Sequence, residues 1–352
     1  MITFRHAKET DKEQIKELWY QCFHDEKSYI DMYLSYGFST DEVYVAVKQN
    51  QLKECSCDTE HLYGSEEEIV AMLQMIPVEL NNSKEIIVNT SQKISMELSS
   101  SKEELLAASY ITENKQCQVV EGRYVYAVAT KESARGQGLM RRLEAFAEEE
   151  EKKQGATFFT LVPASQSLFS LYKQIGYETY TTICEDWVAI QETAKKKEWN
   201  VSPIQIEEYE AIRQRVLQNA GISFIHFINP SYWIQEMKDT KRGVIKLIDN
   251  NDSIYVLYGK DNDGNLWIQE CICENGQLDG GKIQEIGVYF GVEKLHIRLH
   301  SDTHSDTHSD AHSQPNKVFL PKRPYSMIKW VDNMHFVEQK EYDRSYMNLM
   351  LD

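Results

Sequence analysis

Two glycines and three arginines cluster in RGQGLMRR, residues 135–142. Gly136 and Gly138 let backbone amides turn toward one point, and the helical pattern that follows offers unpaired amides and a positive dipole end. Such a turn can hold an anion such as a pyrophosphate. Arg141 and Arg142 fall in the first turn of the helix, where positive charge costs a few tenths to about 1 kcal/mol. A phosphate-rich ligand would offset this cost, and the alternative is that both arginines are solvated on an exposed face.

The elements around this turn alternate between strands and helices. Residues 124–130 (YVYAVAT) predict a strand before the turn, and 139–154 predict a helix with one apolar face. In that helix Glu148 and Glu149 each have a lysine four residues on. A strand at 157–162, a short helix at 165–174 that ends near Gly176, and a strand at 177–183 follow. The order is typical of an α/β fold with short connections.

Two motifs in this region resemble the acetyl-CoA-binding core of the GNAT acyltransferase superfamily. YVYAVATKESARGQGLM is similar to its cofactor motif, R/Q-x-x-G-x-G/A, with Arg135 and Gly138 in the first two fixed places. LVPASQSLFSLYKQIGYE is similar to its closing motif, with Leu171, Tyr172 and Gly176. Met140 stands where the general motif has a small residue, as in the enhanced intracellular survival (Eis) type. The resemblance implies a mixed sheet flanked by helices, followed by a second, degenerate GNAT-like domain.

The resemblance also implies a set of cofactor-binding residues. Backbone groups of a strand would face the pantetheine arm, with one amide polarising the thioester carbonyl. The turn would wrap the pyrophosphate, and two polar residues would face the other side of the cofactor. These residues are Val128, Ala129 and Thr130 on the strand, Arg135, Gly136, Gln137, Gly138, Leu139, Met140 and Arg141 in the turn, and Ser165 and Gln166 on the other side.

Two catalytic groups are expected by the same resemblance. Tyr172 would meet the departing thiolate, and a hydrogen bond is favoured over immediate proton transfer, because a phenol near pKa 10 protonates a thiolate near 8.5 uphill by about 2 kcal/mol. The alternative for Tyr172 is a core tyrosine at helical spacing. A base is needed because an alkylamine near pKa 10.4 is protonated at neutral pH. The carboxylate of Asp352 is the candidate and Glu79 a weaker one, against the default of a frayed surface tail.

The length of 352 residues predicts two domains. We expect a GNAT domain at 1–190, with polar insertions near 50–66 and 81–120 and a core strand from Ile69 that ends near Pro77. A linker at 191–203 leads to a GNAT-like domain at 204–352 without the cofactor motif, which holds a meander with hairpin turns, a helix and a terminal strand at 346–351. The repeat HSDTHSDTHSDAHS at 300–313 predicts a surface loop, and its spaced histidines leave metal binding as an alternative.

Composition and charge limit the partners. A net charge of −17 argues against a protein that tracks nucleic-acid phosphates, and no stretch of 18 apolar residues predicts a membrane span. Seven scattered cysteines predict reduced thiols, a cytoplasmic location and, because the two C-x-C pairs lack nearby partners, no metal site. We expect an N-acetyltransferase with acetyl-CoA as co-substrate, direct attack by a small-molecule or peptide amine, and no nucleic acid or membrane partner; an oligomer is compatible. The alternatives are a non-catalytic acyl-CoA-binding regulator and a transferase that uses aminoacyl-tRNA.

Overall fold

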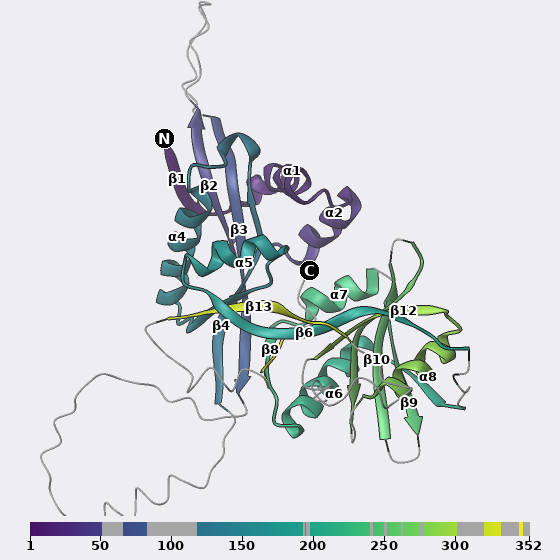
Figure 1. Cartoon of the computed structure of the whole chain (residues 1–352). Helices are drawn as coiled ribbons and strands as arrows, with labels where there is room; N and C mark the ends of the chain where they lie inside the picture. The colour runs from purple at the N-terminus through teal and green to yellow at the C-terminus, as the bar shows by residue number, and fades with distance from the viewer. Residues whose placement is uncertain are drawn as a thin grey trace, which may run out of the picture.

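A computed structural model describes eleven stretches of the chain: 1–50, 66–82, 118–192, 194, 198–239, 242–249, 252–261, 263–274, 278–300, 320–331 and 345–347. Within these residues 14 strands form one mixed sheet that runs through the whole molecule (Figure 1). The path of neighbouring strands is β1-β2-β3-β4-β5-β13-β6-β12-β11-β10-β9-β7, and β8 pairs with β3 and β14. This confirms the expected α/β fold, a mixed sheet flanked by helices.

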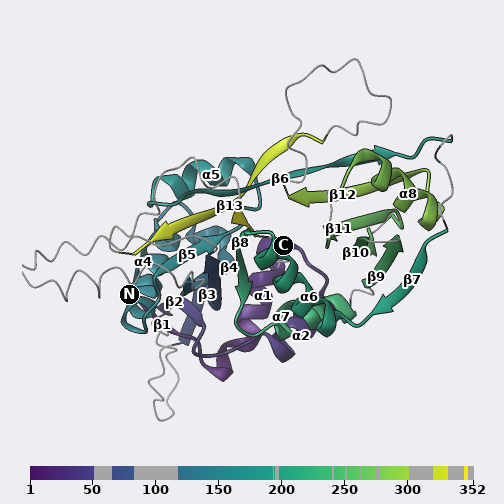
Figure 2. The same ribbon diagram turned by 90° about the horizontal axis from the view of Figure 1, so that it is seen from below.

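The first part of the chain builds one end of the sheet. Its helices cover both faces, with α1 and α2 on one face and α4 and α5 on the other (Figure 2). The elements are β1 (Ile2–His6), the 3-10 turn η1 (Glu9–Asp11), α1 (Lys12–Phe23), α2 (Lys27–Tyr36), β2 (Val43–Asn50), β3 (Glu66–Asn82), β4 (Gln118–Thr130), η2 (Glu132–Ala134), α4 (Leu139–Lys153), β5 (Phe158–Leu161), α5 (Gln166–Lys173) and β6 (Glu178–Ala189).

The second part builds the other end. Helix α8 covers one face of the strands, and α6 and α7 lie on the side of α1 and α2. The elements are β7 (Asn200–Ile204), α6 (Ile206–Asn219), β8 (Ser223–Phe227), α7 (Ser231–Asp239), β9 (Gly243–Asp249), β10 (Asp252–Lys260), β11 (Leu266–Cys273), α8 (Gly280–Phe290), β12 (Lys294–His300), β13 (Lys322–Trp330) and β14 (Ser345–Tyr346). The predicted meander is confirmed as β9, β10 and β11.

Strand β13 was not anticipated from the sequence. It lies between β5 and β6, antiparallel to both, with Met327 opposite Leu161 and Lys322 opposite Cys184. Residues near the C-terminus therefore complete the sheet of the first half. No periodicity within the first 190 residues carries this information, because the pairing partners are about 160 positions apart in the chain.

Several predicted boundaries differ from the structure. Strand β3 does not end near Pro77 but continues to Asn82. Its neighbour on one edge is β2 up to Gln74 and β8 from Val78 onward, so Pro77 sits where the partner changes and its missing N–H breaks no ladder bond. Strands β3 and β4 also extend into the expected insertion at 81–120, and β7 begins inside the expected linker. The domain limits themselves stay a prediction.

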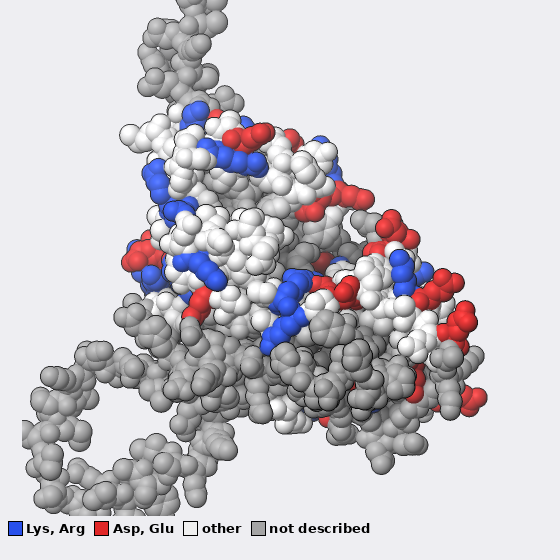
Figure 3. All heavy atoms as spheres, viewed as in Figure 1, with Lys and Arg blue, Asp and Glu red and all other residues white. Residues whose placement is uncertain are grey.

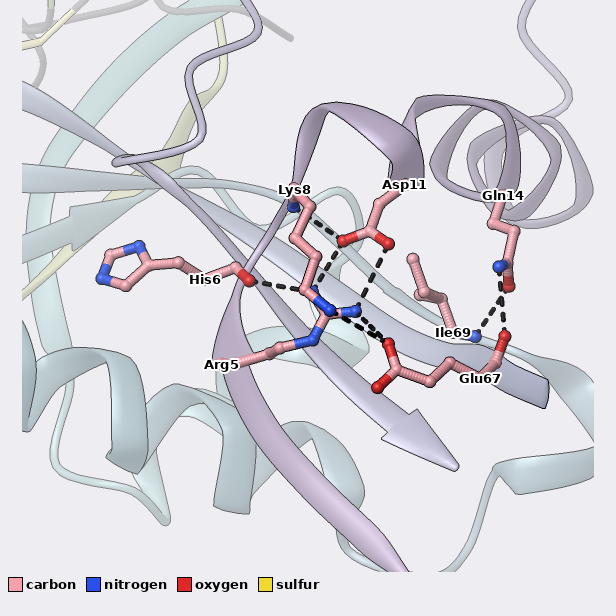
Figure 4. Close-up of polar contacts among 7 residues, drawn as sticks. All are labelled: Arg5, His6, Lys8, Asp11, Gln14, Glu67 and Ile69. Carbon is pink, nitrogen blue, oxygen red and sulfur yellow. Dashed lines mark hydrogen bonds and ion pairs between the residues drawn. The ribbon is translucent and has the colours of Figure 1, made fainter. Parts of the chain in front are cut away.

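An ionic cluster fixes the start of α1 against the sheet (Figure 4). Arg5 on β1 donates to Asp11 at 2.7 Å and to Glu67 of β3 at 2.9 Å, and the Lys8 amide donates to Asp11 at 2.7 Å. Burial alone would raise the pKa of Asp11, but the hydrogen bonds from Arg5 and Lys8 outweigh it and hold the pKa below its ordinary value. Gln14 bridges to β3 as well, donating to the Glu67 carbonyl oxygen and accepting from the amide of Ile69. The helix that carries Cys22 is thus held in one position.

Candidate functional site

The turn between β4 and α4 leaves its amides open. Gly136 and Gly138 have φ of +75° and +67°, in the left-handed region that favours glycine, and a Cβ added at either would meet nothing within 4 Å. Helix α4 begins after Gly138 without a side-chain cap and without an acidic residue in its first turn. Because the first amides of a helix have no partner inside it, they remain available to an anion on the open side of the turn.

Arg135 holds the turn onto the end of β4. Its Nε donates to the carbonyl oxygen of Thr130 at 3.1 Å, and Cys22 of α1 donates to the same oxygen at 3.5 Å. A guanidinium nitrogen of Arg135 also lies 3.8 Å from the Cys22 sulfur. Arg135 and Cys22 therefore shape the turn together. Sequence reasoning missed Cys22, because a lone cysteine 113 residues before Arg135 gives no signal of this contact.

The other polar residues of the turn have protein partners as well. Arg141 donates to the side chain of Gln174 at 2.5 Å, at the end of α5. Arg142 stacks over the ring of Phe4, with its guanidinium carbon 5.0 Å from the centroid. Gln137 donates to the carbonyl oxygen of Ser133 at 3.5 Å. The ring of Phe4 thus offsets part of the electrostatic cost of placing Arg142 in the first turn of a helix. From the sequence, a bound anion or solvent was expected to offset this cost.

Strands β4 and β5 separate beside the turn. Their parallel pairing is limited to Arg123 opposite Phe159 and Tyr124 opposite Thr160, after which β4 continues to Thr130. The register between β3 and β4 also shifts in this stretch. Two residue steps on β3, from Met72 to Gln74, lie opposite three residue steps on β4, from Tyr126 to Ala129, so β4 carries one extra residue as a β-bulge. Ala127 in this bulge has φ of +50°, a strained conformation for a non-glycine residue. The edge of β4 at residues 125–130 is therefore unpaired toward β5, where Val128, Ala129 and Thr130 lie.

Tyr172 of α5 is part of the core on the side of α4. It is 7% exposed and belongs to the same core cluster as Leu139, and Val128 packs against that cluster. Its ring meets that of Tyr177 edge-on, with centroids 5.6 Å apart. Burial, and then the charge of Glu144, raise the pKa of Tyr172 well above its ordinary value. Val128, Leu139 and Tyr172 thus belong to one core region, and Tyr172 is a weaker acid than a free phenol.

Three residues of the candidate site lie at its margins. Ser165 precedes α5, bonds to the hydroxyl of Ser167 at 2.9 Å and is exposed, as is Gln166. Met140 is half-buried in the first turn of α4. Their side chains are oriented by local structure only, and their predicted role toward a cofactor stays a prediction.

Helix α4 buries three carboxylates on one face. Glu151 accepts from Arg123 at 2.6 Å and Tyr44 at 2.8 Å, and Glu148 binds Lys329 of β13 at 2.7 and 2.8 Å. The expected pairing of Glu148 with a lysine on its own helix is therefore wrong, because β13 brings a lysine to the buried face. Glu144 is 2% exposed and has no cation within ion-pair distance among the described residues. Burial, followed by the charge of Glu148, raises its pKa to about 7, against smaller opposing influences of Tyr177 and Lys329.

The described residues show no contact between either candidate base and this site. Asp352 lies outside them, as do residues 301–313 of the histidine repeat. Glu79 pairs with Glu121 of β4 and His226 of β8, far along the ladder from Thr130, which lies opposite Ala71. At about 3.3 Å per residue, Glu79 is roughly 25 Å from that end of β4. Ile76, which lies opposite Tyr124, is only three residues from Glu79 on β3, so the roles of Glu79 and Asp352 both stay predictions.

Charges of both signs are mixed on one face of the molecule. On the face shown in Figure 3, lysines and arginines are interspersed with acidic and uncharged side chains. No helix in the described ranges combines the length and apolar character needed to cross a membrane. Among the same residues, no group of three His, Cys, Asp or Glu side chains is arranged to hold a metal ion.

A family model matches the part of the chain that contains the turn. Residues 109–180 match the family model for the acetyltransferase (GNAT) domain, a span that includes the turn and Tyr172. None of the curated proteins compared with the chain matches it.

Several solved structures share the fold over nearly the whole chain. A GCN5-related N-acetyltransferase from Anabaena variabilis is 14% identical with a TM-score of 0.59, over 93% of this chain and 72% of that one. A probable N-acyltransferase from Enterococcus faecalis is 13% identical with a TM-score of 0.61, over 94% and 73%. Eis1 from Mycobacterium abscessus is 9% identical with a TM-score of 0.55, over 94% and 74%. The family match confirms the resemblance seen in the sequence for residues 109–180, and the solved structures show the same fold over nearly the whole chain.

Proposed function

We propose that the chain is an N-acetyltransferase that binds acetyl-CoA in its first half and transfers the acetyl group directly to a primary amine. The observation that carries the proposal is the combination of an open, uncapped turn at Gly136–Gly138 with the unpaired edge of β4 beside it. The turn supplies amides for the pyrophosphate, and the edge supplies backbone groups for the pantetheine arm. Val128 has no register partner on β3 at the Ala127 bulge, and we propose that its amide polarises the thioester carbonyl.

The proposed reaction needs no covalent enzyme intermediate. The neutral amine attacks the carbonyl carbon, the N–C bond forms, and the C–S bond breaks with its electron pair leaving on sulfur. The proton lost from nitrogen goes to a base, for which Asp352 is our candidate, and one proton returns to the thiolate of CoA. Because its pKa is raised, Tyr172 serves mainly as a hydrogen-bond donor to the departing sulfur rather than as an immediate proton donor.

The acceptor is proposed as a small-molecule or peptide amine, and only the first half is proposed to bind cofactor. A second candidate function follows from the packing of Tyr172, which sits in a core cluster like an ordinary structural tyrosine. It is a non-catalytic protein that binds acyl-CoA and regulates a partner. Turnover separates the two candidates, since both predict CoA binding.

The test uses the full chain. Calorimetry with acetyl-CoA should give one site, and thiol release should follow addition of an amine from a panel of polyamines, aminoglycosides and lysine-rich peptides. Tyr172→Phe should lower kcat at least tenfold and leave acetyl-CoA affinity nearly unchanged. Tight binding without thiol release on any amine would favour the regulator, and absence of both would refute the proposed function. Equal loss of affinity and turnover in Tyr172→Phe would show that the tyrosine is structural.

A further inference from the structure

The proposed binding of acetyl-CoA determines which way its acyl group lies along β4. With the pyrophosphate at the turn after Thr130 and the pantetheine beside residues 128–130, the acyl group points back along β4 toward Tyr124. Tyr124 and Thr160 form the last pair before β4 and β5 separate. Because paired strands lie about 4.8 Å apart, an acyl chain cannot pass this pair within the plane of the sheet.

The space around that last pair is closed on both faces of the sheet. Phe159 and Leu161 pack in the core cluster under α4 and α5. On the other face the fully buried Thr160 donates to the carbonyl oxygen of Met327 at 2.8 Å, and the sulfur of Met347 lies 3.4 Å from the same hydroxyl. Met347 is 1% exposed and belongs to the core cluster that includes Tyr124. It therefore packs against Thr160, at the last β4–β5 pair, on the face of α1 and α2.

Met347 reaches this place through the second half of the chain. It follows β14, which pairs in parallel with β8 and is held by Tyr346. The Tyr346 hydroxyl donates to Glu270, and the guanidinium of Arg213 stacks over the Tyr346 ring at 5.3 Å. Arg213 also donates to Glu270 at 3.1 Å, with both side chains almost completely buried. A buried ionic cluster thus fixes the residue beside Met347.

We propose that Met347 is a specificity-determining residue that limits the length of the acyl chain, so that the donor is an acyl-CoA with a short acyl group. This inference rests on the proposed function. Among the residues packed around the Tyr124–Thr160 pair, Met347 is the one whose side chain can be varied most easily, because it is unbranched and its segment is held by a strand of only two residues. Shortening it should extend the gap past Thr160.

The experiment measures binding, so that it does not depend on the acceptor. Calorimetry compares acetyl-CoA, butyryl-CoA and octanoyl-CoA on the full-length wild type, on Met347→Ala and on a control, Met237→Ala. Met237 lies on α7, is also 1% exposed and belongs to the same core cluster, so its truncation reproduces the loss of buried volume elsewhere. We expect the wild type to bind octanoyl-CoA at least tenfold more weakly than acetyl-CoA. Met347→Ala should reduce that ratio at least fivefold, whereas Met237→Ala should keep it.

The possible outcomes separate the inference from the proposed function. Equal affinity of the wild type for all three donors, or the wild-type ratio in Met347→Ala, overturns the inference and leaves acetyl-CoA binding intact. A wild type that binds none of the donors refutes the proposed function itself. Should Met347→Ala fail to fold, Met347→Val removes less volume and should shift the ratio in the same direction by a smaller factor. A folded Met347→Val with an unchanged ratio also overturns the inference.

Discussion

The two halves of the molecule each place a helix after a strand that carries a bulge, and the two helices begin differently. In the first half α4 starts at Gly138 with no side-chain cap. In the second half α8 starts at Asp279, whose carboxylate accepts from the amide of Lys282 at 2.8 Å. A built-in anion thus occupies the helix end in the second half. The corresponding end in the first half has no acidic residue in its first turn.

The strand edges differ in the same sense. The bulge of β4 at Ala127 is followed by backbone that is unpaired toward β5. The register of β11 against β10 also shifts, between Leu257 and Tyr258, and next to this shift Glu270 is enclosed by Arg213, Tyr209 and Tyr346. Related architecture therefore leaves an unpaired strand edge in one half and holds a charged core in the other. The difference lies in which side chains fill the space rather than in the fold.

The largest effect is expected from breaking the charged core of the second half. Glu270→Gln leaves Arg213 buried without its main counter-charge, so we expect the free energy of unfolding to fall by about 3 kcal/mol or more. Denaturant titration measures this loss. Glu274→Gln is the control, because Glu274 is partly exposed and pairs with the exposed Arg215. It should cost less than about 1 kcal/mol, and equal costs in the two variants would contradict a special role for the buried pair.

Removing the charge of Glu144, a buried carboxylate of the first half, should have the opposite effect and stabilise the protein. The folded-state pKa of Glu144, about 7, lies above its unfolded value of 4.5, so the folded state binds more protons between these values and stability falls as pH rises through them. The penalty is complete above pH 7 and amounts to about 3 kcal/mol. Glu144→Gln should therefore stabilise the protein by up to that amount at pH 8, and by far less at pH 5.

The control for Glu144 is the next buried carboxylate on the same helix. Glu148→Gln removes the partner of Lys329 and should destabilise the protein at pH 8. Thermal or denaturant unfolding of both variants at the two pH values checks the signs. A Glu144→Gln effect that does not change with pH would show that the carboxylate does not titrate in this range.

Copying the cap of α8 onto α4 should abolish cofactor binding. Gly138→Asp places a carboxylate where the pyrophosphate is proposed to lie, and we expect the affinity for CoA to fall at least 100-fold in calorimetry. Gly138→Asn is the matched control, because Asn has the same shape without the charge and tolerates a positive φ as well as Asp does. It should lose about 10-fold less than the Asp variant. Equal losses would mean that backbone shape, rather than charge, explains the effect.

The smallest effect is expected from the reverse change. Asp279→Ala removes the cap of α8 and should cost about 1 kcal/mol of stability, as for other helix caps. It should not create a second CoA site, because the bulge side of β11 remains filled by Arg213 and Tyr346. Calorimetry that gave two CoA molecules per chain would show that the cap alone distinguishes the halves.

Much of the candidate site was readable from local sequence. The strand before the turn, the turn itself and the helix after it lie within the 36 residues 118–153, and their periodicity and glycines specify them without distant partners. Second-half elements such as the meander and α8 followed from the same local rules. The insertion of β13, the contact of Cys22 with Thr130 and the pairing of Glu148 with Lys329 did not. Each joins residues more than 100 positions apart, where no periodicity operates.

The sequence alone therefore determined the chemistry that the turn can offer, because glycines with positive φ and an uncapped helix start are properties of a short segment. Only the tertiary structure decided what surrounds that turn. It buried Glu144 with no cation at ion-pair distance in the described part of the chain and raised its pKa, and it set Met347 against Thr160 through a cluster in the other half of the chain. The burial of a side chain and its charged neighbours depend on which distant segments of the chain come into contact, and the packing of the whole sheet sets these contacts.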